Sequence, residues 1–116
     1  MLVEDHKAFR QALAFLLSGE HDLEVVAQAG SLSEARQMLD TPLDEAVLDS
    51  SLPNGDGREL IGELHRANAG ISVLVLSVTI RPRHLEEVLK AGADAVLHKV
   101  ASPATIVEEV RRLAGG

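Results

Sequence analysis

Apolar runs alternate along the chain with segments in which apolar residues recur at helical spacing. The runs predict five strands, at residues 1–3, 23–29, 46–49, 71–78 and 95–98. A segment with i, i+3, i+4 periodicity follows each run and predicts a helix. Strict alternation of strand and helix is typical of a parallel sheet with right-handed crossovers and helices on both faces.

Start and stop signals support the predicted helices. Ser31 and Glu34 form a capping box before the second helix, and Ser102 is an N-cap for the last one. Gly92 ends the fourth helix. The apolar residues that we expect the five helices to bury are, in chain order, Phe9, Ala12, Leu13, Leu16 and Leu17; Ala35, Met38 and Leu39; Leu60, Ile61 and Leu64; Leu85, Val88 and Leu89; and Ile106, Val107, Val110 and Leu113.

We expect an α/β domain with a flavodoxin-like (βα)5 fold, because the common doubly wound solution for five parallel strands is the order 2-1-3-4-5. In that order the first and third strands are neighbours, so Glu4 and Asp5 are predicted to lie beside Asp49. The fourth strand leads to Ser77 and the fifth to Lys99. These side chains share the carboxyl edge of the sheet, where ligands bind in open α/β folds.

The residue types at this edge favour a metal-assisted anion site. Three carboxylates repel one another unless a positive charge lies among them. Oxygen ligands of this kind suit a hard divalent cation such as Mg²⁺. An anionic group on Asp49 would also meet the Ser77 hydroxyl and the Lys99 ammonium, which is the arrangement that phosphoryl transfer requires.

Composition narrows the classes of function. A chain of 116 residues, with 46% hydrophobic and 25% charged residues, is expected to form one globular domain. The absence of cysteine excludes disulfides and thiolate chemistry and allows an intracellular location. No apolar run approaches the roughly 20 residues of a membrane span. The net charge of −7 repels a phosphate backbone, so we expect no direct contact with DNA.

Over essentially its whole length, residues 1–116, the chain resembles the receiver domains of two-component response regulators. The opening L-V-E-D-H is most similar to the NarL/FixJ-type subclass. The residues that carry the resemblance at the family's spacing are Glu4, Asp5, Asp49, Pro53, Gly57, Ser77 and Lys99.

The resemblance implies a phosphorylation-dependent switch. In the family, the aspartate at the position of Asp49 accepts a phosphoryl group from a phosphohistidine of a sensor histidine kinase. The implied cofactor is Mg²⁺ (or Mn²⁺), with Asp5, Asp49 and the Ser51 main-chain carbonyl as ligands and Glu4 assisting through water. Such a domain takes part in its own phosphorylation and dephosphorylation but is not otherwise an enzyme.

The implied roles of the remaining site residues concern signal output. Lys99 would pair with the phosphoryl oxygens, and Ser77 would move to bind one of them and signal to the face formed by the fourth helix, last strand and last helix. That face, or the first and last helices, could form a homodimer. The resemblance further implies a cytoplasmic bacterial regulator of transcription, whose C-terminal helix-turn-helix output domain is absent from this chain.

Three features depart from the family pattern, two single residues and the length of the first strand. Val96 stands where an aromatic residue usually reports phosphorylation, so an aromatic flip is excluded. Val78 stands where alanine or glycine is usual, and its branched side chain is expected to narrow the approach to Asp49. The first strand has only three residues before Glu4, which suggests a truncated or misassigned start and predicts a shortened edge to that strand and lower stability.

Two other classes of function compete with the phosphorylated switch. The first is a degenerate receiver that binds proteins independently of phosphate, which Val78 and Val96 motivate.

The second is an enzyme on a related fold. A flavodoxin-like FMN carrier would need aromatic residues around the ring, and the aromatic residues are limited to Phe9 and Phe15. An aspartyl phosphatase would need a second acid where Ser51 stands.

Overall fold

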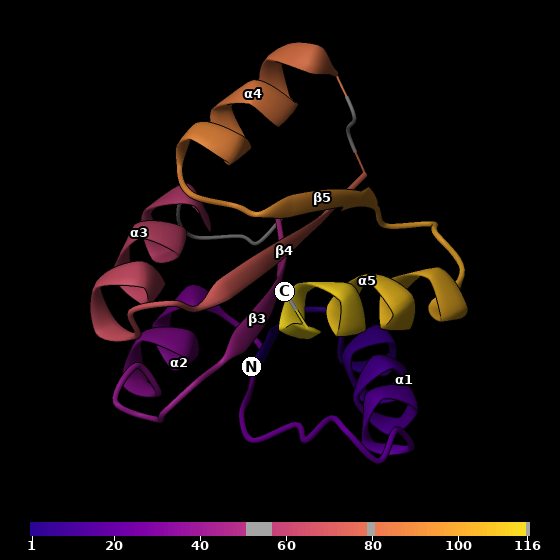
Figure 1. Cartoon of the computed structure of the whole chain (residues 1–116). Helices are drawn as coiled ribbons and strands as arrows, with labels where there is room; N and C mark the ends of the chain where they lie inside the picture. Colours follow the sequence, from indigo (N-terminus) through magenta and orange to yellow (C-terminus); the bar gives the residue numbers. More distant parts are fainter. Residues whose placement is uncertain (51–56, 79–80, 116) are drawn as a thin grey trace.

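The structure is a computed structural model that describes residues 1–50, 57–78 and 81–115. Strands and helices alternate strictly within these ranges (Figure 1). The strands are β1 (Leu2–Val3), β2 (Gln28–Ala29), β3 (Glu45–Asp49), β4 (Ser72–Ser77) and β5 (Ala95–His98). The helices are α1 (Lys7–Ser18), α2 (Leu32–Gln37), α3 (Gly57–Ala67), α4 (Pro82–Lys90) and α5 (Pro103–Gly115).

The strands form one parallel sheet in the order β2-β1-β3-β4-β5, which confirms the predicted topology. In the register of this sheet Val3 lies opposite Leu48 and Asp49 lies opposite Leu76. The next pair of strands aligns Ser77 with His98. The carboxyl ends of β1, β3, β4 and β5 therefore reach the same edge of the sheet.

Two apolar cores cover the two faces of the sheet. In β4, Val73 and Val75 point into the core beneath α2, α3 and α4, whereas Leu74 and Leu76 point into the core beneath α1 and α5. This alternation follows from the two-residue period of a strand. Figure 1 shows α1 and α5 together on one side and α2, α3 and α4 on the other. In the described ranges no helix is long and apolar enough to cross a bilayer.

The second strand is shorter than the sequence predicts. Strand pairing of β2 is confined to Gln28 and Ala29, whereas the apolar pattern predicted a strand over residues 23–29. Its neighbour β1 has only two paired residues, so positions 23–26 have no strand beside them to bond with. Val26 is 48% exposed as a result. The first strand is itself short, Leu2–Val3, as the three-residue lead-in predicted.

The buried faces of the helices are narrower than their periodicity predicts. In α1 the buried residues include Ala14, whereas Ala12 and Leu16 are exposed. In α4 only Val88 is buried and Leu89 is 50% exposed. The second helix ends at Gln37, so Met38 caps it rather than extending it. A helix lying on a sheet buries only the stripe that faces the sheet, so apolar residues at the margins of that stripe stay in solvent.

Candidate functional site

Buried polar groups in the described part of the chain gather at the carboxyl edge of the sheet. The polar or charged residues that are buried there are Glu4, Asp49 and Ser77, which are 4%, 2% and 0% exposed. Glu4 follows β1, and Asp49 and Ser77 are the last residues of β3 and β4. Burying such groups costs free energy unless partners compensate them, so this edge requires an explanation beyond packing.

Three carboxylates converge at this edge as the strand order predicts. Glu4, Asp5 and Asp49 each offer a carboxylate oxygen, and these atoms lie within 4.8 Å of one another. Asp5 is exposed, whereas the other two acids are buried. Glu4 and Asp5 directly follow β1 and Asp49 ends β3, and these two strands are neighbours in the sheet although α1, β2 and α2 separate them in sequence.

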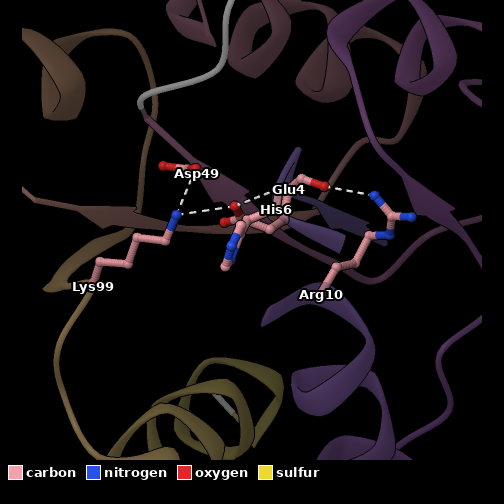
Figure 2. Close-up of polar contacts among 5 residues, drawn as sticks. All are labelled: Glu4, His6, Arg10, Asp49 and Lys99. Atoms are coloured by element: carbon pink, nitrogen blue, oxygen red, sulfur yellow. Dashed lines mark hydrogen bonds and ion pairs between the residues drawn. The ribbon is translucent and has the colours of Figure 1, made fainter. Parts of the chain in front are cut away.

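The Lys99 ammonium lies between the two buried acids. Its Nζ donates to Glu4 Oε1 and to Asp49 Oδ2, each at 2.9 Å (Figure 2). The Lys99 side chain is 19% exposed, so both ion pairs are largely screened from water. The backbone N–H of Lys99 also donates to the Ser77 carbonyl at 2.9 Å, which fixes the end of β5 against β4.

Burial and pairing act in opposite directions on the ionisable groups. Burial raises the pKa of Glu4 above its ordinary value, although hydrogen bonds from Lys99 and from the His6 backbone partly offset the shift. Burial would lower the pKa of Lys99, but its bonds to Asp49 and Glu4 outweigh burial and raise that pKa. Pairing therefore favours the charged form of Lys99, whereas burial favours the protonated form of Glu4.

The Glu4 segment is held from the opposite side as well. Arg10, in the first turns of α1, donates from Nη1 to the main-chain oxygen of Glu4 at 2.7 Å (Figure 2). The backbone N–H of His6 donates to Glu4 Oε1 at 3.0 Å. Sequence reasoning missed both residues. The first turns of α1 start at this edge, which was a usable signal for Arg10, but His6 acts through its backbone and leaves no signal in the sequence.

The donor set fits a divalent cation. Glu4 Oε2 is buried and makes no hydrogen bond among the described residues. An unpartnered carboxylate oxygen beside two more carboxylates is the oxygen-rich environment that Mg²⁺ prefers. Glu4, Asp5 and Asp49 could therefore hold such an ion at this acidic pocket. Ser51, whose main-chain carbonyl the resemblance implies as a further ligand, lies outside the described residues.

The two atypical positions lie just after β4 and within β5. Val78 directly follows β4 and is 55% exposed. Val96 is half-buried in β5 and packs against the core beneath α2, α3 and α4. Val96 therefore serves as a core side chain, and an aliphatic residue at this position has no ring to turn toward solvent.

Comparison with known proteins gives a consistent result. The response regulator receiver domain family matches residues 1–111. The chain is 37% identical to the transcriptional regulatory protein UhpA of Salmonella typhimurium, over 99% of this chain and 58% of UhpA. The chain thus spans little more than half the length of this curated relative.

Solved structures share the fold throughout. The receiver domain of the putative response regulator NarL from Mycobacterium tuberculosis superposes with a TM-score of 0.89 at 28% identity, covering 99% of this chain and 94% of that one. A Burkholderia pseudomallei response regulator with a phosphorylated aspartic acid and a calcium ion gives a TM-score of 0.85 at 25% identity, covering 98% and 66%.

These matches are to signalling proteins and not to a flavin carrier or a phosphatase. They agree with the strand order already described. The chain belongs to the response regulator receiver domain family and is of the NarL/FixJ type.

Proposed function

We propose that Asp49 is the phosphoacceptor of a signalling switch and receives its phosphoryl group from a phosphohistidine of a sensor histidine kinase. The observation that carries the proposal is the setting of Asp49 at the end of β3, 2.9 Å from Lys99 and beside Glu4 and Asp5. A carboxylate oxygen forms the new bond to phosphorus while the phosphorus–nitrogen bond breaks and the imidazole leaves. The phosphorylated aspartate of the Burkholderia relative supports this chemistry on this fold.

The acid cluster serves the reaction by holding a divalent cation, Mg²⁺ or Mn²⁺. Glu4, Asp5 and Asp49 supply carboxylates, and the Ser51 carbonyl is the additional protein ligand that the family resemblance implies. When bound, the ion neutralises charge that develops on the phosphoryl oxygens. The calcium ion in the Burkholderia relative is consistent with a divalent site in this family.

Two further side chains act on the phosphoryl group. Lys99 pairs its ammonium with a phosphoryl oxygen, since it already lies against Asp49. Ser77, buried at the end of β4, hydrogen-bonds another oxygen and carries the change to the face formed by α4, β5 and α5. The domain thereby takes part in its own phosphorylation and dephosphorylation, without turnover of another substrate.

The output of the switch is control of transcription, which requires the full-length regulator. We assign residues 1–116 to the receiver and a DNA-binding helix-turn-helix to the remainder of the full-length protein. The name of UhpA and the 58% coverage of that relative support this division. The receiver itself makes no direct DNA contact, because its net charge is −7. A regulator of this kind works in the cytoplasm.

Two surfaces suit homodimer formation. On the α1/α5 side, Phe15 is 80% exposed and Leu16 is 40% exposed. On α4, Leu89 is 50% exposed, and Lys90 of the same helix pairs with Glu86. Exposed apolar side chains of this size favour protein contacts.

The proposal is tested by mass spectrometry of the protein after incubation with Mg²⁺ and acetyl phosphate or a phosphorylated kinase domain. We expect a gain of about 80 Da, one phosphoryl group. Asp49→Asn should abolish the gain, whereas the exposed Asp40→Asn should retain it. A gain that survives in Asp49→Asn would move the acceptor elsewhere.

The phosphate-independent interaction module is the second candidate. The half-buried Val96 favours it, because the position contributes to the core and offers no aromatic relay. The same incubation decides between the two. A wild-type chain that gains no mass from either donor, with Mg²⁺ in excess, would leave the interaction module as the better description.

A further inference from the structure

An aromatic ring lies over the cation of the site. The Lys99 Nζ is 5.1 Å from the centroid of the Phe9 ring, which belongs to the first turn of α1. We infer that Phe9 is a positioning residue that holds the Lys99 ammonium against Asp49. This inference rests on the proposed function, because it concerns the cation that meets the phosphoryl group.

The ring is itself held in place. Phe9 is half-buried and packs against the core beneath α1 and α5. A distance of 5.1 Å lies inside the range of about 6 Å over which a ring face attracts an ammonium. The chain has only two phenylalanines and no tryptophan or tyrosine, and the second, Phe15, is 80% exposed on the same helix. The contact therefore uses the one aromatic ring that is fixed against the core in the described structure.

The ring adds a third side-chain contact to the two ion pairs that already hold the Lys99 ammonium. The lysine stem is long and flexible, and the next residue, Val100, is 79% exposed. Two of the three ammonium N–H groups are directed to Glu4 and Asp49. The ring supplies a further contact from α1, so β1, β3 and α1 all constrain the cation.

The chemical character of the ring matters as much as its position. Carboxylates that hold the ammonium also compete with an incoming phosphoryl group for its hydrogen bonds. A ring face carries no formal charge and accepts no strong hydrogen bond, so it restrains the ammonium without occupying those donors. The Phe9 contact is thus compatible with Lys99 turning its N–H groups from a carboxylate to a phosphoryl oxygen.

A purely structural role for Phe9 predicts different behaviour from a positioning role. If the ring only fills apolar space, leucine should replace it well and tryptophan should fit poorly. If the ring face positions Lys99, leucine should fail and tryptophan, the strongest cation–π partner, should restore the effect. Phe15→Leu is the matched control, since it removes the other ring from the same helix.

The first test needs neither metal nor phosphate. In the NMR spectrum of the metal-free wild-type chain, the Lys99 Hε protons should be shifted upfield by the ring current of Phe9. Phe9→Leu should return them to ordinary lysine values, Phe9→Trp should keep the shift, and Phe15→Leu should leave it unchanged. A Lys99 signal that is ordinary in the wild type, or unchanged in Phe9→Leu, overturns the contact.

The second test measures phosphorylation by acetyl phosphate as maximal rate and half-saturating concentration. We expect Phe9→Leu to lower the maximal rate about 5-fold, the loss of one contact of this kind, with Phe9→Trp near wild type. Equal rates in wild type and Phe9→Leu would overturn the positioning role. If the wild type gains no phosphoryl group, the proposed function fails while the NMR result still decides the contact. Phe9→Met, which keeps a flexible apolar side chain, replaces Phe9→Leu if that variant fails to fold.

Discussion

Replacing Lys99 with methionine keeps most of the apolar stem but removes the ammonium that lies 2.9 Å from both Glu4 and Asp49. At that distance and an effective dielectric constant of about 20, the Coulomb attraction of each ion pair is about 6 kcal/mol before the cost of desolvation is subtracted. The measured cost of breaking a buried pair is about 3–5 kcal/mol, because a charge is left buried without compensation. Since Lys99 is 19% exposed, we expect about 3 kcal/mol, the lower end of that range.

Urea unfolding at neutral pH with a chelator present measures this cost as a difference in the free energy of unfolding. Adding Glu4→Gln to Lys99→Met should recover a large part of it, because the second change removes one of the uncompensated carboxylates. Excess Mg²⁺ should stabilise Lys99→Met more than the wild type, since the ion then meets the acids without a competing ammonium. Lys90→Met is the control: Lys90 forms an exposed pair with Glu86, so its loss should cost less than about 1 kcal/mol.

The pH dependence follows from Glu4. Burial already raises its pKa above 4.5 in the folded state, and loss of Lys99 removes a hydrogen bond that opposes this shift. The folded variant therefore binds a proton that the unfolded chain releases, and its deficit should shrink as pH falls from 7 toward 4.5. A Lys99→Met chain as stable as the wild type, with no response to Glu4→Gln or to pH, would refute the view that Lys99 compensates buried acids.

Three further changes have defined outcomes. Gly92→Ala should lower the free energy of unfolding, measured in urea, by about 2–3 kcal/mol, because φ is +117° and a Cβ would lie 2.9 Å from the His65 ring. Gly70→Ala should lower it by only about 1 kcal/mol, because φ is +85° but a Cβ there would meet nothing within 4 Å. Burial raises the pKa of Glu45 to about 7, so the free energy of unfolding should fall as pH rises from 4.5 to about 7. Glu45→Gln should remove that fall. At about pH 8 the variant should be more stable than the wild type by about 1–2 kcal/mol, allowing for partial exposure. Val78→Ala should speed dephosphorylation in a mass-spectrometric time course; an unchanged rate removes Val78 as a barrier to water.

The arrangement of the fold was predictable because it depends on patterns that recur along the whole chain. Alternating apolar runs and helical segments predicted the strand order, which the structure confirms. The extent of β2 was not predictable from its own residues. Leu23 and Val25 are apolar as a strand requires, but pairing also needs a neighbour, and β1 offers only Leu2 and Val3. Strand length was thus decided by another segment of the chain.

Part of the candidate site could also be predicted from the sequence, and part could not. The convergence of Glu4, Asp5 and Asp49 was predictable, since parallel strands present their carboxyl ends at one edge. The part of the site that depends on side-chain direction was not. The start of α1 at this edge places Phe9 and Arg10 near the site, but their spacing does not show that the ring covers Lys99 or that the guanidinium bonds the Glu4 carbonyl. Those contacts require the rotation of α1 on the sheet, which only the packed structure defines.

The ion pairs of Lys99 join positions that are 95 and 50 residues apart along the chain. Closing segments of that length carries an entropic cost that local contacts do not have. The pairs cannot form until β5 has joined the sheet beside β4. A chain that is still being synthesised, or that has lost its last βα unit, holds the acids without their cation. The buried acids and their cation are therefore together only in molecules in which β5 has joined the sheet.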